Sequence, residues 1–450
     1  MSYRAPAPVP HTRPLNAIEF VLTMARNPLE IWGQGAFTLP VVRADWLGTP
    51  TFIVNDPQMI RHIMVENSKN YVMQPLRQRV LRPILRDGLL TVEGELWRRT
   101  RKSMAPVFAP RNTQALASSM LDTSRTFAAQ LGTKAGKDVD ISTEMTLLTF
   151  DILQATLFTG DIAGEPHEFS AAVGTLLRTM GRVDPLDVLD APAFIPRMTR
   201  VLGRRSLSYF RTLIAGTIAH REALLRTKPD SAPRDLLTLL LETEGLSRSQ
   251  IEDNIITFIG AGHETTARAL AWTLFLLSQV PEELAKVEAE ISGLDEDGSD
   301  PAGWADHLVY TRAALEEAMR LYPPAPSLNR ASVEADQVAG TSIPAHSTVL
   351  IMPWVLHRHE RLWSRPTIFD PSRFLPENRG KLDRYQYLPF GIGPRVCIGQ
   401  SFAMQEAVIA LAVLLRRFRF EFVGKTDPRP VQKITVQPEG GIKMRLYPRV

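Results

Sequence analysis

The longest regular feature of the sequence is one helical pattern that runs unbroken from Ser247 to Pro281. Ser247 and Gln250 have the spacing of a capping box, in which each side chain binds the backbone N–H of the other residue. With no proline before Pro281, the helix has roughly 30 residues and, at about 1.5 Å per residue, a length of about 45–50 Å. A helix of this length must cross the whole molecule.

The rest of the chain predicts a mainly α fold with small β-sheets, of the α+β class. From about residue 95 to 320, apolar residues recur at three- and four-residue spacing, which is the helical period. Three short segments have strand patterns instead: 39–55, 333–353 and 431–447, the last divided by Gly440-Gly441. Four prolines make residues 1–14 an extended N-terminus, and we expect residues 15–450 to form a single domain.

Composition excludes several classes of protein. Hydrophobic residues make up 44% of the chain and charged residues 22%, which is typical of a globular protein. The net charge of +4 is too small to indicate nucleic-acid binding. No apolar run has the length of a signal peptide or membrane anchor, and there is a single cysteine, so we expect a soluble, cytoplasmic protein without disulfides.

That cysteine, Cys397, lies in the glycine-rich segment FGIGPRVCIG, directly before an apolar helical pattern. Gly393 and Gly399 allow backbone N–H groups to approach the sulfur, and the start of the next helix favours an anion. Phe390 can shield the sulfur from water. The residues alone leave two interpretations open, a reactive thiolate or an ordinary buried thiol.

The segment resembles the haem-binding signature of the cytochrome P450 superfamily, FxxGxRxCxG, and matches all its fixed positions: Phe390, Gly393, Arg395, Cys397 and Gly399. The resemblance implies a haem b cofactor whose iron is bound by the Cys397 thiolate, which favours cleavage of the O–O bond. It also implies that Arg395 reaches a haem propionate. The implied fold is a triangular, α-rich body with a long central distal helix and a smaller β-rich part.

Glu317 and Arg320 are three residues apart and can form an ion pair on one helix face. Taken alone, such a pair is usually an exposed one of little consequence. The P450 family, however, has an ExxR pair that is joined by the arginine of a PxRF segment, here Arg373. The resemblance therefore implies a buried network of Glu317, Arg320 and Arg373 with a structural role behind the cysteine loop.

The motif AGHETT lies within the long helix, although glycine and threonine are poor helix formers. Ala261 and Gly262 would let a ligand lie against the backbone, and the Thr265 hydroxyl could open a groove for O2 and water. The motif resembles the oxygen-activation motif of the family. That resemblance implies catalytic roles for Thr265, as a hydrogen-bond donor to dioxygen, and Glu264, as a proton relay. A chance Thr-Thr pair on a buried helix is the alternative.

Two further patterns provide cationic partners for the two haem propionates. Trp97 and Arg101 match the WxxxR pattern of the family, and Arg330 follows a proline-rich turn. Carboxylates in a dry pocket need such partners. The resemblance extends from about residue 35 to 446.

The segments expected to cover the substrate are mainly apolar, which favours an apolar substrate such as a fatty acid, terpenoid or carotenoid-like molecule. We expect Phe258, Ala261 and Leu328 to line its pocket. The covering segments are 72–92, 170–205, 325–329 and the tip near Glu439 and Gly440. Arg77, Arg79 and Arg82 could bind a substrate carboxylate, although solvated loop charges are the favoured interpretation.

No flavin or iron–sulfur domain is recognisable, so electrons are expected from a separate ferredoxin and ferredoxin reductase. A basic face for an acidic ferredoxin could be formed by Arg98, Arg99, Lys102, Arg395, Arg416 and Arg417. Two alternative functions are a peroxygenase that uses hydrogen peroxide directly and a non-catalytic haem protein that senses a gas or binds a ligand. Neither requires the Glu264–Thr265 pair.

Overall fold

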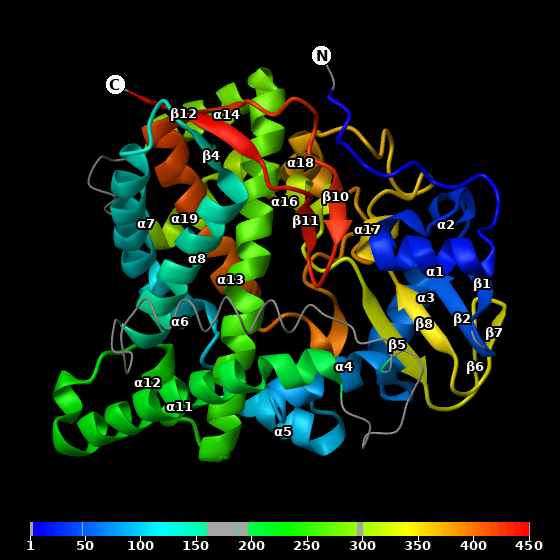
Figure 1. Cartoon of the computed structure of the whole chain (residues 1–450), viewed down its shortest axis with the longest axis horizontal. Coiled ribbons are helices and arrows are strands. Elements are labelled where there is room, and N and C mark those ends of the chain that lie inside the picture. Colours follow the sequence, from blue (N-terminus) through cyan, green and yellow to red (C-terminus); the bar gives the residue numbers. More distant parts are fainter. Residues whose placement is uncertain (1–2, 47, 160–186, 188–196, 295–299, 450) are drawn as a thin grey trace.

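The computed structural model describes residues 3–46, 48–159, 187, 197–294 and 300–449. Helix α13 (Arg248–Gln279) runs through the middle of the molecule (Figure 1). Its N-terminus carries the predicted capping box: the Gln250 N–H donates to Ser247 Oγ, and the Ser247 N–H donates to Gln250 Oε1. The start and length of the long helix are thus confirmed.

An α-rich body surrounds α13, which contacts α8, α11, α16 and α19 directly. The first helices are α1 (Ala17–Arg26), α2 (Gln34–Thr38), α3 (Pro57–Arg61), α4 (Pro75–Leu85), α5 (Gly94–Met104), α6 (Pro110–Ala115), α7 (Ala117–Gly132), α8 (Ile141–Phe158), α11 (Met198–Thr227) and α12 (Leu236–Leu241). After α13 come α14 (Pro281–Ser292), α15 (Trp304–His307), α16 (Val309–Leu321), α17 (Pro353–Leu356), α18 (Pro376–Arg379) and α19 (Gln400–Arg417).

The β-rich part stands beside this body (Figure 1). Its main sheet has the order β1-β2-β8-β5-β3, with β2 and β8 parallel and the other neighbours antiparallel. The strands of this sheet are β1 (Val41–Trp46), β2 (Thr49–Val54), β3 (Tyr71–Met73), β5 (Leu328–Ser332) and β8 (Thr348–Ile351). The smaller sheets contain β4 (Asp138–Asp140), β6 (Asp336–Val338), β7 (Thr341–Ile343), β9 (Phe418–Phe422), β10 (Pro430–Gln432), β11 (Val436–Pro438) and β12 (Lys443–Pro448).

All three segments with strand patterns form strands. Residues 39–55 contain the β1–β2 hairpin, in which Val41 pairs with Val54. Gly440 and Gly441 separate β11 from β12, which join different sheets, and both glycines have positive φ. A Cβ at Gly441 would lie 2.4 Å from the Asp140 carboxylate oxygens, so this close approach requires glycine.

The two parts have separate hydrophobic cores. The larger core fills the α-rich body, where Trp272 of α13 stacks on Tyr322 with ring centroids 3.7 Å apart. A second core, which includes Phe52, Ile343 and Leu388, lies under the main sheet. Within the described part of the chain, no helix is both long and apolar enough to cross a membrane. The division into an N-terminal extension and one domain stays a prediction.

Candidate active site

The loop before α19 presents Cys397, and its backbone is fixed by glycine. The Cys397 N–H donates to the carbonyl oxygen of Phe390 over 2.9 Å, which closes the loop. Gly393 has a φ of 75°, and a Cβ there would lie 2.0 Å from the carbonyl oxygen of Met64. Only glycine fits this position, because any side chain would collide with backbone.

The Cys397 side chain is solvent-accessible, yet protein atoms surround it on most sides. This desolvation raises the pKa of the thiol, while a hydrogen bond from the Gly399 N–H and the nearby Arg101 guanidinium act in the opposite direction. The sulfur therefore has two groups beside it that stabilise a thiolate. Helix α19, which begins at Gln400, adds the positive end of its dipole.

A buried ion-pair network lies on α16. Arg320 donates to both carboxylate oxygens of Glu317 over 2.7 Å, and neither side chain is exposed. Arg373 Nε lies 3.4 Å from Glu317 Oε1, and the Asp370 N–H donates to the same oxygen over 3.0 Å. The structure thus brings together the three residues that the sequence grouped.

The network reaches the cysteine loop through one histidine that sequence reasoning missed. Arg320 Nη1 donates to the carbonyl oxygen of His357 over 2.7 Å. The His357 Nε2 atom accepts a hydrogen bond from the Leu388 N–H, two residues before Phe390. Burial lowers the pKa of His357 well below its usual value, so the ring is neutral and Nε2 can accept. His357 therefore holds Arg320 through its backbone carbonyl oxygen and the loop through its ring.

Three arginines from distant segments converge near this loop. Burial, together with the nearby Arg77 and Arg395 guanidinium groups, lowers the pKa of Arg330 to about 10. Arg395 binds Glu93 over 2.5 Å, and the Glu93 carboxylate partly offsets the lowering of the Arg330 pKa. Arg77 is itself desolvated, so the interpretation of this residue as a solvated loop charge is wrong. Glu93 and the position of Arg77 have no local sequence signal.

Trp97 and Arg101 both lie on α5, next to the same cluster. The guanidinium carbon of Arg395 lies 4.5 Å from the centre of the Trp97 ring. Burial lowers the pKa of Arg101, and the neighbouring Cys397 opposes that shift. One helix therefore connects the arginine cluster with the sulfur.

Helix α13 has a stripe of solvent-accessible residues, although most of its other residues are buried. Ala261 is exposed, and Phe258, Gly262 and Thr265 are partly exposed, although the helix lies in the core. The Thr265 hydroxyl donates to the carbonyl oxygen of Ala261 over 2.8 Å. The helix continues unbroken through the motif, so the expected local opening of its hydrogen bonds is not present. Side-chain back-bonding satisfies the hydroxyl without breaking the helix.

Glu264 is held by two residues that sequence reasoning missed. Its Oε1 atom accepts hydrogen bonds from Thr435 Oγ1 over 2.7 Å and from Gln437 Nε2 over 2.6 Å. These residues belong to the β10–β11 hairpin, whose tip is residues 433–435. Glu439 and Gly440 form the turn after β11, where Glu439 pairs with Arg429 at the exposed surface, and the prediction that this turn covers a substrate stays a prediction.

The predicted pocket residues Phe258 and Leu328 belong to different cores. Phe258 packs against Phe108 with ring centroids 4.9 Å apart, on the side of the α-rich body. Leu328 packs in the β-rich part, and a Cβ at Gly391 would touch it. Most of the segment 170–205 lies outside the described residues.

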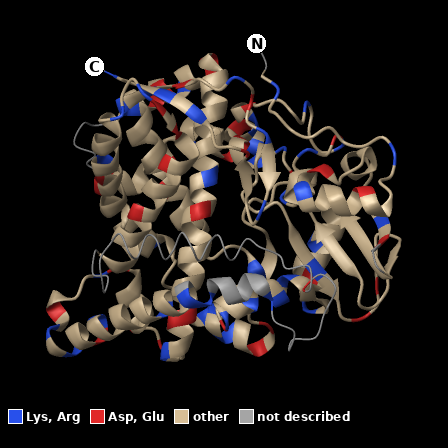
Figure 2. Ribbon diagram, in the orientation of Figure 1, with Lys and Arg blue, Asp and Glu red and all other residues tan. Residues whose placement is uncertain are grey.

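The expected basic face is smaller than proposed. Figure 2 shows lysines and arginines gathered around the lower part of the molecule, where α5 lies. Arg98, Arg99 and Lys102 belong to α5, and Arg98 also pairs with Glu95 over 2.8 Å. Arg395 turns inward to Glu93. Arg416 and Arg417 lie at the far end of α19, about 25 Å from its first residue at about 1.5 Å per residue, and do not extend the α5 cluster.

Together these features fit haem b. The accessible Cys397 sulfur offers an iron ligand, and the arginine cluster holds an excess of buried positive charge that two propionates would balance. The exposed Ala261 in a core helix leaves backbone open to a flat ligand. Each feature comes from a different segment of the chain.

Known proteins are similar to this chain in sequence and in fold. The chain matches the Cytochrome P450 family over residues 9–446. Cyclooctatin synthase of Streptomyces melanosporofaciens is 32% identical over 93% of this chain and 91% of its own length. The chloroplastic protein Lutein deficient 5 of Arabidopsis thaliana is 30% identical over 88% of this chain and 70% of its own length.

The crystal structure of the cytochrome P450DA heme domain has the same fold. It superposes with a TM-score of 0.81 over 99% of both chains, at 24% sequence identity. The predicted fold class, mainly α with small β-sheets, is confirmed. The chain therefore belongs to the cytochrome P450 family of haem b monooxygenases.

Proposed function

We propose that this monooxygenase hydroxylates an apolar molecule of the fatty acid, terpenoid or carotenoid-like class, with electrons from a separate ferredoxin and its reductase. The observation that carries the proposal is the accessible stripe on α13, where apolar Phe258 and Ala261 stand beside the hydroxyl of Thr265. Such a stripe holds an apolar substrate by shape. Relatives named cyclooctatin synthase and cytokinin hydroxylase, at 32% and 29% identity, are consistent with a small organic substrate.

Haem b, when bound, supplies the activation of dioxygen. Cys397 would hold the iron, assisted by the Gly399 N–H, while Phe390 shields the sulfur from water. Arg330, Arg395 and Trp97, with Arg101 close to the sulfur, would hold the cofactor's carboxylates. Arg77 joins this set because its guanidinium lies near Arg395.

The remaining chemistry is proton supply. Substrate, O2, two electrons and two protons give the hydroxylated product and one water. The Thr265 hydroxyl, which donates to Ala261 in this structure, would rotate to donate toward the dioxygen side. Glu264, one residue earlier on the helix, would deliver the protons.

The experiment uses the purified holoprotein with ferredoxin, its reductase, NADPH and ¹⁸O-labelled O2. Apolar compounds that shift the Soret band are first selected as candidate substrates. The proposal expects one labelled oxygen atom in the product. Product formed only with hydrogen peroxide would indicate a peroxygenase, and Soret shifts without any product would indicate a ligand-binding haem protein.

A further inference from the structure

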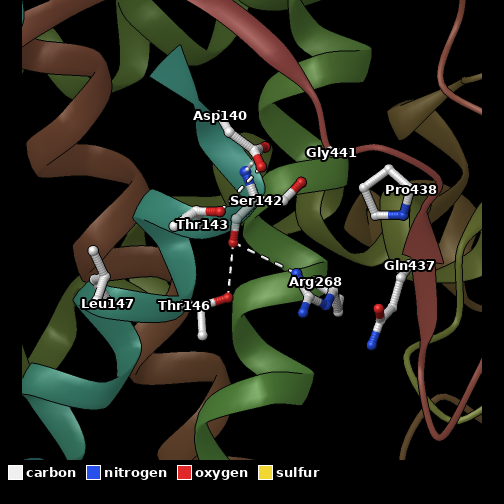
Figure 3. Close-up of a pocket in the computed structure, with 9 residues that line it drawn as sticks. All are labelled: Asp140, Ser142, Thr143, Thr146, Leu147, Arg268, Gln437, Pro438 and Gly441. Atoms are coloured by element: carbon white, nitrogen blue, oxygen red, sulfur yellow. Dashed lines mark hydrogen bonds between the residues drawn. The ribbon is translucent and has the colours of Figure 1, made fainter. Parts of the chain in front are cut away.

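A polar pocket of about 330 Å³ lies between the start of α8, the middle of α13 and the β11–β12 turn (Figure 3). Its lining includes Asp140, Ser142, Thr143, Thr146, Arg268 and Gln437. These six of the nine lining residues carry hydroxyl, amide or charged groups, and the other three are Leu147, Pro438 and Gly441, so the pocket offers enough polar partners to hold water. None of its residues belongs to the cysteine loop, the arginine cluster or the accessible stripe of α13.

Two residues connect this pocket to Glu264. Gln437 lines the pocket and donates to Glu264 Oε1 over 2.6 Å. Arg268 also lines it, and its Nη2 atom lies 3.8 Å from the same oxygen. Glu264 itself is buried, with 6% of its surface exposed. The carboxylate therefore lies one side chain away from the pocket.

The two oxygens of Glu264 differ. Oε1 accepts two hydrogen bonds, from Thr435 and Gln437, and faces Arg268. Among the described residues, no hydrogen bond is formed by Oε2. A carboxylate pinned through one oxygen keeps its orientation while the other oxygen can take up and release a proton.

Two carboxylates interact with Arg268 in the wall of the pocket. Burial lowers its pKa, and Glu264 and Asp140 oppose that shift. Its Nη1 atom lies 3.5 Å from the carbonyl oxygen of Ser142, as Figure 3 shows, and its buried Nε atom has no hydrogen-bond partner in the described structure. A guanidinium placed here offers hydrogen-bond donors to water in the pocket.

We propose that this pocket is the solvent end of the proton path, and that Gln437 and Arg268 are positioning residues that keep Glu264 directed toward it. The inference rests on the proposed function, since Glu264 matters only if protons are consumed on the Thr265 side. A proton from the bulk solvent passes through water in the pocket to Glu264 Oε2, and Glu264 passes one proton on toward Thr265, so the water is restored and two such transfers supply one turnover. Each cycle returns the carboxylate to its ionised form, so charge and protons balance.

The first test removes the positioning contact in the holoprotein. Gln437→Met keeps the side-chain length but removes the donor to Glu264. We expect the share of electrons lost as hydrogen peroxide and the solvent isotope effect on product formation each to rise, the former by roughly tenfold. Haem content and the carbon monoxide spectrum should not change. Thr143→Val is the control, because Thr143 lines the same pocket but bonds only to Asp140.

The second test needs no turnover. The infrared band of the Glu264 carboxyl is assigned by subtracting the spectrum of Glu264→Gln, and its response to a rapid pH jump is followed. Thr146→Phe fills the pocket, so we expect the response to slow by roughly tenfold. In the parent protein the band should follow the bulk pH at once.

The outcomes separate the two proposals. An unchanged peroxide share and isotope effect in Gln437→Met, or an unchanged pH response in Thr146→Phe, would overturn the proton path. If the parent protein forms no oxygenated product, the proposed function fails instead. The infrared measurement then still decides whether solvent reaches Glu264 through this pocket.

Discussion

Glu317 shows how one carboxylate can decide the stability of a whole loop. It accepts bonds from Arg320 on both oxygens and from the backbone of Asp370, with no contact to solvent. A charge that is fully buried depends on its partners, because water cannot replace them. Arg320 in turn binds the backbone at His357, Pro366 and Ile368, so the network fixes several segments at once.

Glu317→Ala leaves the Arg320 guanidinium buried without its carboxylate. We expect a loss of roughly 3–5 kcal/mol in the free energy of unfolding, together with loss of haem binding. Glu95→Ala is the matched control, since Glu95 and Arg98 have the same three-residue spacing but are exposed. That change should cost about 0.5 kcal/mol or less. If chemical denaturation showed the same loss of stability for Glu317→Ala and Glu95→Ala, the structural role of the buried network would be contradicted.

A second buried carboxyl, Glu406 on α19, predicts a pH effect. It is 2% exposed, and burial raises its pKa to about 8, with only Thr266 opposing the shift. Between its ordinary pKa of 4.5 and about 8, the folded chain holds a proton that the unfolded chain releases. Stability is therefore lost as the pH rises through this window.

Glu406→Gln removes this proton dependence and keeps the shape of the side chain. Relative to the parent, the variant should gain stability from pH 5 to pH 8, at most about 1.4 kcal/mol per pH unit. Denaturation curves at several pH values measure the difference. Glu421→Gln, at an exposed site on β9, should follow the parent at every pH. If the difference in unfolding free energy between Glu406→Gln and the parent did not change with pH, the conclusion that Glu406 is protonated in the folded chain would be wrong.

At the scale of elements, the cysteine loop depends on how closely it meets η2 (His62–Glu66). Gly393→Ala places a Cβ against the Met64 carbonyl at a positive φ. The loop must then shift, at a cost of about 2 kcal/mol or more, and the thiolate-specific carbon monoxide band should weaken. Gly380→Ala meets no atom within 4 Å and should leave the band unchanged. A full band in Gly393→Ala would show that the loop geometry is not required.

Helix α5 carries the basic residues proposed to meet an acidic ferredoxin. Reversing the charge at Arg98 and Arg99 together should slow electron transfer by roughly tenfold at low salt and flatten its dependence on ionic strength. Stopped-flow reduction of the haem measures both effects. The same reversal at Arg417 and Arg419 is the control, because these exposed residues lie at the distant end of α19. An unchanged rate in the α5 variant would exclude this docking surface.

Elements with local signals were predictable from the sequence, and long-range contacts were not. The capping box at Ser247 and Gln250 specifies the start of α13, and Gly393 of the cysteine loop is required by a contact with the Met64 backbone that any side chain would break. By contrast, Thr435 and Gln437 reach Glu264 from about 170 residues away. No spacing in the sequence indicates such a long-range contact. The ion pair between Glu93 and Arg395 has no sequence signal for the same reason.

At the scale of the whole molecule, the candidate site lies between two separately packed parts. Cys397, the α5 residues and α13 come from the α-rich body, whereas Arg330 and Leu328 come from the main sheet. The sequence predicted both parts and the order of the motifs. It assigned Arg330 and Arg395 to the same cofactor but did not predict that Arg77 joins them, because that convergence depends on how α4, β5 and the cysteine loop meet in space.

The most direct test of the account is the absorption spectrum of the purified holoprotein, reduced under carbon monoxide. Thiolate ligation by Cys397 predicts a band at about 450 nm. Cys397→Ser should lose this band even where haem is retained, since a hydroxyl does not replace a thiolate donor. A parent protein without the band, or a Cys397→Ser variant that keeps it, would contradict the central claim that Cys397 binds the haem iron.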